Sequence, residues 1–286
     1  MRDFDWQHHL EAALAACREA GEIHRTYFRS PGLAVHLKED ESPVTKSDRL
    51  AEEAIRSMLQ RAVPGLGFLG EEFGQEGDQR DRWIVDPLDA TRNFVAGLPY
   101  FATLIGLQLD GELVLGVVHA PALGPGSGVE APAHSNAAEG RGETWWAARG
   151  QGAFAGVGTL FATCCDRRLR VSQVRDLGQA FVLHGGLRYI QRAGMWGGFS
   201  DIVSRAANTR GFGDWWGHIL VAEGRCDAMI EGTVALHDVA ALKPILEEAG
   251  GMLVARGDAP FEAGYCSPTL STNRHLCDEL RRALGI

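Results

Sequence analysis

Trp83-Ile84-Val85-Asp86-Pro87-Leu88-Asp89-Ala90-Thr91-Arg92-Asn93-Phe94 carries the densest chemistry in the chain. The apolar residues before Asp86 predict a buried strand that ends at this aspartate. Pro87 stops sheet pairing and presets φ for a turn or a first helical position, and Asp89 follows one turn later. The two carboxylates would then lie at one end of a sheet. The backbone amides after Asp89 would open a helix N-terminus, which suits phosphate oxygens.

Two carboxylates held this close repel each other unless a hard cation lies between them, and ligands that are all oxygen favour Mg²⁺ over zinc or copper. Alone, Asp86 and Asp89 fit a turn and a helix cap better than a metal site. Further acids change that balance. Gly70-Glu71-Glu72 follows another predicted strand, and Asp238 lies where a helix begins, although a helix cap is an equally good interpretation of Asp238.

Four motifs in this order resemble the inositol monophosphatase family, the lithium-sensitive magnesium phosphatases. The resemblance runs from about residue 43 to residue 251 and more weakly to the C-terminus. Its motifs are Pro43-Val44-Thr45-Lys46-Ser47-Asp48, Gly70-Glu71-Glu72, Asp86-Pro87-Leu88-Asp89-Ala90-Thr91 with Asn93-Phe94, and His237-Asp238-Val239-Ala240-Ala241 leading to Glu248-Ala249-Gly250-Gly251.

The resemblance implies two or three Mg²⁺ ions and direct in-line attack by a metal-activated water, without a phosphoenzyme. Glu71, Asp86 and the Leu88 carbonyl would hold the first ion, and Asp86, Asp89 and Asp238 the second. Glu71, Thr91 and Asp48 would be catalytic, the last two by polarising the attacking water. The amides of Ala90 and Thr91 would cradle the phosphate. Asp86-x-x-Asp89 does not fit the DxDx(T/V) pattern of haloacid-type phosphatases, which use an aspartyl nucleophile.

The chain departs from the family pattern at two positions. Ala90 stands where the family usually has glycine, which is harmless at helical φ and ψ but costly if φ is positive. His237 stands where tryptophan is usual, and a partly buried packing role is favoured over contact with the site. Glu72 is equally suited to a supporting or third-metal role and to being a solvated neighbour.

The substrate prediction depends on Gly213-Asp214-Trp215-Trp216 and on Ala241-Leu242-Lys243-Pro244, which resemble the histidinol-phosphate phosphatase branch. Asp214 and Glu231 would face a substrate ammonium, and the two tryptophans would flank a flat ring. Alternatively, Trp215 and Trp216 are core aromatics of a helix that Asp214 caps.

The predicted substrate is therefore a small phosphorylated metabolite, with histidinol phosphate favoured over inositol or sugar phosphates. A nucleotide-type ester such as a 3′-phosphoadenosine compound should need a basic pocket that the sequence does not indicate. A different class remains open as well: a family member that has lost catalysis and acts as a binding protein. Ala90 is the only hint of this, and retention of the acidic residues argues against it.

Composition restricts the possible partners and the compartment. The 286 residues are 45% apolar and carry a formal net charge of −9, which disfavours binding to nucleic acid. No apolar run is long enough for a membrane span or a signal peptide. The six cysteines lack metal-binding spacing, so we expect reduced thiols in a cytoplasmic protein. The family resemblance implies a homodimer.

The remaining pattern predicts a layered α/β fold, an αβαβα sandwich by the resemblance. Amphipathic helices are expected over residues 4–28 and over 47–61, the latter capped by Ser47, with a loop at 42–46. We expect strands over 66–70 and 83–85, and a hairpin of 102–109 and 112–119 joined at Asp110-Gly111. Residues 124–142 look like an exposed loop.

The second half alternates strand and helix signals. Strands are expected over 181–184 and 227–230, and helices over 215–223 and 239–249, the last ended by Gly250-Gly251. The chain is expected to be one phosphatase unit, with a metal- and phosphate-binding part over residues 1–180 and a smaller α/β part over 181–286.

Overall fold

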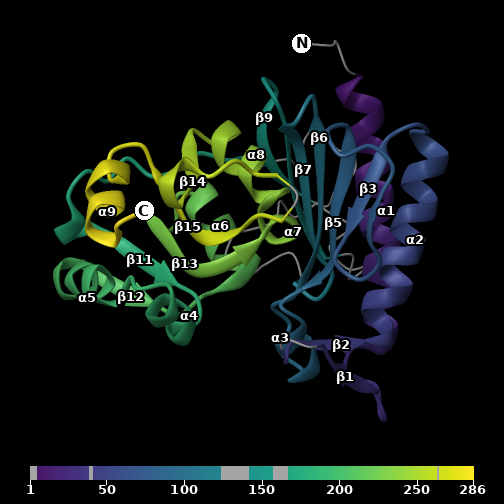
Figure 1. The fold of residues 1–286 in the computed structure, drawn as a ribbon, viewed down its shortest axis with the longest axis horizontal. Helices are drawn as coiled ribbons and strands as arrows, with labels where there is room; N and C mark the ends of the chain where they lie inside the picture. Colours follow the sequence, from purple (N-terminus) through teal and green to yellow (C-terminus); the bar gives the residue numbers. More distant parts are fainter. Residues whose placement is uncertain (1–4, 39–40, 124–141, 157–166, 263) are drawn as a thin grey trace, which may run out of the picture.

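The computed structural model describes residues 5–38, 41–123, 142–156, 167–262 and 264–286. The loop predicted over 124–142 lies outside these residues except for Gly142. The described elements form five layers in the order helix, sheet, helix, sheet, helix (Figure 1). The predicted αβαβα sandwich is therefore confirmed.

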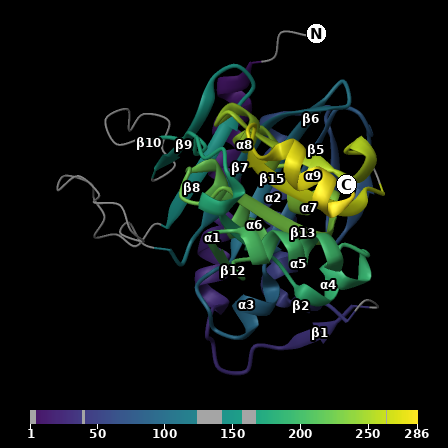
Figure 2. The same cartoon turned by 90° about the vertical axis from the view of Figure 1, so that its left-hand side faces the viewer.

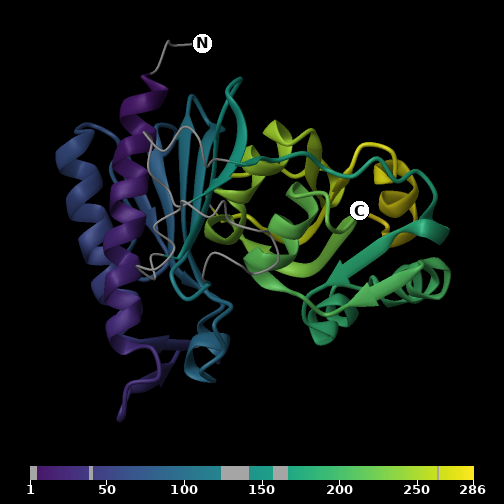
Figure 3. The same ribbon diagram turned by 180° about the vertical axis from the view of Figure 1, so that it is seen from behind.

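The first helical layer and the larger sheet come from the N-terminal part of the chain. The layer consists of α1 (Trp6–Tyr27) and α2 (Lys46–Ala62), which lie along the outer face of the sheet (Figure 3). The sheet has eight strands in the order β10-β9-β8-β7-β6-β5-β3-β4. In chain order they are β3 (Gly67–Gly70), β4 (Gly74–Glu76), β5 (Arg82–Asp89), β6 (Ala102–Leu109), β7 (Glu112–Ala120), β8 (Glu143–Ala148), β9 (Gly152–Gly156) and β10 (Arg167–Arg168).

A small hairpin and a short helix extend from the end of this sheet where the acids lie. The hairpin is formed by β1 (Val35–Leu37) and β2 (Pro43–Thr45), and the helix is α3 (Thr91–Val95). Residues 43–45 are thus a short strand rather than part of a loop. Thr45, not Ser47, caps α2, because its hydroxyl accepts the Ser47 amide while Asp48 accepts the Thr45 amide in a capping box.

The second sheet has five strands in the order β12-β11-β13-β15-β14. Its outer face is covered by α4, α5 and α9, which lie nearest the viewer in Figure 2. The strands are β11 (Phe181–His184), β12 (Asn208–Arg210), β13 (Ala228–Ala235), β14 (Gly251–Ala255) and β15 (Cys266–Asn273), and the helices are α4 (Leu187–Arg192), α5 (Trp196–Arg205) and α9 (Cys277–Leu284).

The central helical layer lies between the two sheets and consists of α6 (Asp214–Ala222), α7 (Leu236–Val239) and α8 (Leu242–Glu248). The single helix predicted over 239–249 is thus wrong: α7 begins before residue 239, and α8 is separate from it. Asp238 lies inside α7, where its Oδ2 accepts the Ala235 amide at 2.6 Å.

The close packing of the central helical layer on the larger sheet depends on two paired glycines. Gly106 of β6 and Gly116 of β7 are register partners. A Cβ at Gly106 would lie 2.7 Å from the Ala240 carbonyl carbon, and one at Gly116 would lie 1.9 Å from the Ala241 oxygen. Side chains at these positions would push the link between α7 and α8 away from the sheet, so the two glycines allow Asp238, two residues earlier, to approach the acids of β5.

Strand β5 does not end at Asp86 as predicted. It continues through Pro87 to Asp89, and all eight of its residues are buried. Its pairing with β6 shifts register between Asp86 and Asp89, and a proline without an amide hydrogen is tolerated at such an irregularity. The Pro87 carbonyl accepts hydrogen bonds from the buried His24 ring and Thr103 hydroxyl, so the irregular end of β5 is held by α1 and by the adjacent strand β6.

Candidate active site

A cavity of about 520 Å³ opens where the ends of the two sheets meet. The larger part of the fold contributes Glu71, Asp89, Ala90, Thr91 and Arg92 to its lining. The smaller part contributes His184, Gly185, Tyr189, Asp214, Trp215, Glu231 and Asp238. Carboxylates far apart in the sequence therefore face one space.

Asp86 and Asp89 are positioned by the irregular end of β5. Asp86 is 2% exposed, and its Oδ1 accepts the Leu88 amide at 2.9 Å. Asp89 accepts the Trp215 amide at 3.2 Å, which connects β5 to the start of α6. Burial and the charges of Glu71, Asp89 and Asp238 raise the pKa of Asp86 well above its usual value. Burial and the charges of Asp214, Asp238 and Glu71 do the same for the pKa of Asp89.

Glu71 and Glu72 follow β3 in a turn that Glu52 holds. The buried Glu52 carboxylate accepts the amides of Glu72 at 2.7 Å and Phe73 at 3.0 Å. Lys38, next to β1, donates to Glu71 at 2.7 Å and to Glu72 at 2.5 Å. The Glu72 side chain is only 4% exposed, so it is not a solvated neighbour of Glu71.

Lys38 is a residue of this site that the sequence analysis missed. Burial alone lowers the pKa of its ammonium, but the Glu71 and Glu72 carboxylates outweigh that effect and raise it. Lys38 therefore remains a cation beside the acidic cluster. A lysine within a run of polar residues carries no local signal for this role, because its partners lie more than thirty positions later in the chain.

Asp48 and Thr91 come together as the resemblance implies. The Thr91 hydroxyl lies 3.2 Å from Asp48 Oδ1 and 2.8 Å from the Leu88 carbonyl. Asp48 also accepts the Thr45 amide at 2.9 Å through its other oxygen. Burial is the main cause that raises the pKa of Asp48 to about 6. One hydroxyl proton can serve only one acceptor at a time, so Thr91 donates either to Leu88 or to Asp48.

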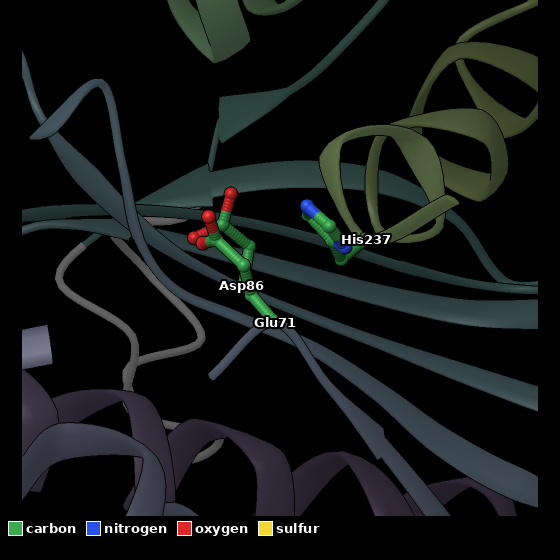
Figure 4. Close-up of side chains that lie close together, drawn as sticks. All are labelled: Glu71, Asp86 and His237. Carbon is green, nitrogen blue, oxygen red and sulfur yellow. The ribbon is translucent and has the colours of Figure 1, made fainter. Parts of the chain in front are cut away.

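His237 lies closer to the acids than a packing role requires. A ring nitrogen of His237 and carboxylate oxygens of Glu71 and Asp86 all lie within 4.8 Å of one another. Figure 4 shows the ring directed from α7 toward the two carboxylates, of which Asp86 belongs to β5 and Glu71 to the turn after β3. His237 Nε2 also lies 3.3 Å from Asp238 Oδ1. The expectation that His237 is a packing substitute for tryptophan is thus incomplete.

Ala90 adopts the positive φ that is energetically costly for an alanine. Its φ of 66° and ψ of 43° are left-handed, the region in which a Cβ is disfavoured. The residue lies between Asp89 and the first turn of α3. A glycine would adopt this conformation without that cost, so the alanine strains the backbone at the cavity wall.

Asp214 and Glu231 lie together in the cavity, beside the acid at the end of β5, since Asp214 directly precedes Trp215, whose amide donates to Asp89. The Asp214 amide donates to Glu231 Oε1 at 3.1 Å. Burial first, then the charge of Asp238, raises the pKa of Asp214 to about 6. Burial first, then the charge of Asp214, raises the pKa of Glu231 to about 8. Gly185 makes room for this pair, since a Cβ there would lie 1.9 Å from Glu231 Oε2.

The tryptophans do not flank the cavity as a pair. Trp215 is 1% exposed and packs on Trp145 with ring centroids 5.5 Å apart. Trp216 contacts Trp145 at 5.9 Å and Tyr100 at 6.3 Å, and it is absent from the described residues that line the cavity. The packing of both rings on Trp145 favours the aromatic-core interpretation, although Trp215 also lines the cavity. His184, Tyr189 and His218 are the other rings in the lining, and neither His184 nor Tyr189 was predicted as a site residue.

The described residues include no helix long and apolar enough to cross a bilayer. The acid-lined cavity between the layers of an αβαβα sandwich places the chain in the class of phosphatases that share this architecture.

The profile of the inositol monophosphatase family matches residues 5–284, and the chain belongs to that family of phosphatases. It is 38% identical to the histidinol-phosphatase of Mycobacterium tuberculosis over 277 residues, which span 96% of this chain and 97% of that protein. It is 31% identical to the inositol-1-monophosphatase of Caulobacter vibrioides, with 96% of both chains covered. A solved inositol monophosphatase from Zymomonas mobilis superposes with a TM-score of 0.79 at 27% identity, covering 99% of this chain and 100% of that one.

Proposed function

We propose that the chain hydrolyses histidinol phosphate to histidinol and phosphate, with Mg²⁺ and without a phosphoenzyme. The observation that carries the proposal is one cavity that contains both an oxygen-rich acidic cluster and an adjoining pair of acids, Asp214 and Glu231. The first group suits divalent cations and a phosphate, and the second suits a positively charged alcohol portion. The proposal treats residues 1–286 as one phosphatase unit, since both sheets contribute to the cavity.

The residues present fit magnesium. Glu71, Asp86, Asp89 and Asp238 bring four carboxylates together, and the Leu88 carbonyl adds a neutral oxygen, a donor set typical of Mg²⁺. Burial first, and then the charges of neighbouring carboxylates, raise the pKa values of Asp86, Asp89 and Asp238, and a bound divalent cation would offset both effects. When bound, the ions would acidify the attacking water and stabilise negative charge on the leaving oxygen.

The protein's own groups would orient the water and the phosphate. When the Thr91 hydroxyl donates to Asp48, the Thr91 oxygen is left to accept a hydrogen bond from the attacking water. Asp48 fixes that orientation because its other oxygen is held by the Thr45 amide. Ala90 and Thr91 line the cavity, and their amides would donate to phosphate oxygens.

Asp214 and Glu231 would bind the ammonium of histidinol phosphate. A pKa of about 8 means that the Glu231 carboxyl carries a proton at neutral pH, because burial and the Asp214 charge disfavour ionisation. A substrate ammonium would favour the ionised form and displace this proton. The pair thus favours a cation over an uncharged polyol, which gains no such electrostatic term. The name of the M. tuberculosis relative agrees with this choice.

An inositol monophosphatase activity is the second candidate, supported by the name of the C. vibrioides relative. The proposal carries three further expectations for the living cell: a cytoplasmic location, a role in histidine biosynthesis and a homodimeric assembly.

A substrate panel tests the proposal. Phosphate release from histidinol phosphate, inositol phosphates, sugar phosphates and nucleotides is measured with Mg²⁺ and with excess chelator. We expect the highest kcat/KM for histidinol phosphate, at least tenfold above inositol phosphates, and no turnover in chelator. Preference for a polyol phosphate would overturn the substrate, and full turnover in chelator would overturn the metal requirement.

A further inference from the structure

We infer that a ring nitrogen of His237 is a metal ligand, so that this site binds a first-row transition ion such as Mn²⁺ or Co²⁺ more tightly than a site with oxygen ligands alone would. The inference deepens the proposed function, since it concerns the metal of the same site. It starts from a neighbour of the acids that offers a nitrogen lone pair rather than an oxygen: the imidazole grouped with Glu71 and Asp86.

The geometry needs only a small adjustment. The three donor atoms lie within 4.8 Å of one another. Donors about 2.1 Å from a common ion lie at most about 4.2 Å apart, so binding an ion would require the carboxylate side chains to rotate inward. The His237 side chain is 23% exposed and lies on the short helix α7, whose approach to the sheet is allowed by Gly106 and Gly116. Its ring is therefore held beside the acids without being sealed from an entering ion.

The chemistry of the donors sets the metal preference. Carboxylate and carbonyl oxygens bind Mg²⁺ well, but an imidazole nitrogen contributes little to a hard ion that prefers oxygen. The same nitrogen strengthens binding of borderline ions, in the order Mn²⁺ below Co²⁺ below Zn²⁺. A tryptophan, the usual family residue here, offers an indole N–H donor and no lone pair for a metal.

The contact between His237 and Asp238 suggests an alternative role for His237, in which its ring binds Asp238 rather than a metal ion. Nε2 lies 3.3 Å from Asp238 Oδ1, and a hydrogen bond there would make His237 a residue that orients Asp238. The two arrangements differ in a measurable way, because only direct ligation places a nitrogen nucleus in the first coordination sphere of the ion.

The first experiment is pulsed electron paramagnetic resonance on chelator-treated full-length protein loaded with one equivalent of Mn²⁺. We expect the ¹⁴N modulation of a directly bound imidazole in the unaltered protein, and its loss in both His237→Trp and His237→Gln. His184→Gln is the matched control, because His184 lines the same cavity outside the metal-binding group; it should keep the signal. Absence of ¹⁴N coupling in the unaltered protein, or its persistence in both His237 variants, overturns the inference.

The second experiment measures metal affinity by calorimetry. Removing the imidazole should weaken Co²⁺ and Mn²⁺ binding at least about tenfold and change Mg²⁺ affinity by less than about threefold, so the preference falls. Equal losses for all three ions would overturn the inference and assign His237 to orienting Asp238. Neither readout requires turnover, so the two proposals can fail separately. If the protein binds an ion through nitrogen but hydrolyses no phosphate ester, the proposed function is wrong and this inference still holds.

Discussion

Neutralising Asp214 or Glu231 tests the substrate assignment most sharply. The changes Asp214→Asn and Glu231→Gln are nearly isosteric and preserve the local backbone. Asparagine is among the residues that tolerate positive φ, which is 57° at Asp214. A glutamine at 231 keeps the side-chain oxygen that accepts the Asp214 amide at 3.1 Å. Both variants should therefore fold, and a loss of activity can be assigned to the lost charge.

The expected magnitude follows from burial. Glu231 is 6% exposed, so a charge-assisted hydrogen bond to a substrate ammonium is screened little by water. Such a bond contributes about 1.5–3 kcal/mol, which corresponds to a loss of roughly 10- to 100-fold in kcat/KM. A neutral aryl phosphate should lose little, since the metal cluster and the phosphate cradle are unchanged.

The assay compares kcat/KM for histidinol phosphate with that for an aryl phosphate in each variant. Asp201→Asn, an exposed acid on α5, is the matched control and should change neither value. Equal losses on both substrates would mean that Asp214 and Glu231 support the fold or the metals. No loss on either would make them ordinary acids. Either outcome removes the electrostatic basis for preferring histidinol phosphate over polyol phosphates.

Three further predictions concern the acids and the strained turn. Asp86→Asn should lower kcat by several orders of magnitude and leave the metal-free fold as stable or about 1 kcal/mol more stable, because repulsion is relieved; a near-normal rate would place the site elsewhere. Ala90→Gly should raise the free energy of unfolding by about 0.5–1 kcal/mol in denaturant titration, because it removes a left-handed alanine; destabilisation would contradict this. Finally, the folded-state pKa values of Asp214, about 6, and Glu231, about 8, exceed the unfolded ones, so the folded state binds more protons. The metal-free protein should therefore lose stability as pH rises from about 5 to about 8, by up to about 1.4 kcal/mol per pH unit for each proton released. Thermal melts in chelator should show this fall, a smaller one in Glu231→Gln, and a weaker one with saturating Mg²⁺; a rise with pH would refute it.

Local sequence signals predicted the elements whose boundaries are set by local chemistry. The hairpin of β6 and β7 turns at Asp110-Gly111, where both residues adopt the positive φ that such a turn requires. The first helix was predicted from its apolar spacing, and α1 buries that stripe against the larger sheet. The order of the four motifs also predicted the fold, but through family resemblance rather than through spacing.

Features that depend on tertiary contacts were missed or misplaced. Pro87 suggested a strand end, but buried partners from α1 and β6 hold its carbonyl and carry the strand on to Asp89. His184 and Tyr189 reach the cavity only because β11 pairs with β13 and ends beside Glu231. Lys38 meets its acids because β1 pairs with β2. None of these contacts lies within one turn of sequence, so periodicity and turn chemistry carry no information about them.

The positions of strain show how the site is assembled. Ala90 and Asp214 are non-glycine residues with positive φ, and both line the cavity. Each is adjacent in sequence to one partner of a single hydrogen bond, in which the Trp215 amide donates to Asp89 at 3.2 Å. This bond joins the end of the larger sheet to the start of the central helical layer. Each strained residue costs on the order of 1 kcal/mol or more, and such strain persists only where the surrounding structure fixes the backbone. The unfavourable conformations therefore accompany the placement of Asp89, which has to serve a helix start and the acidic cluster at once.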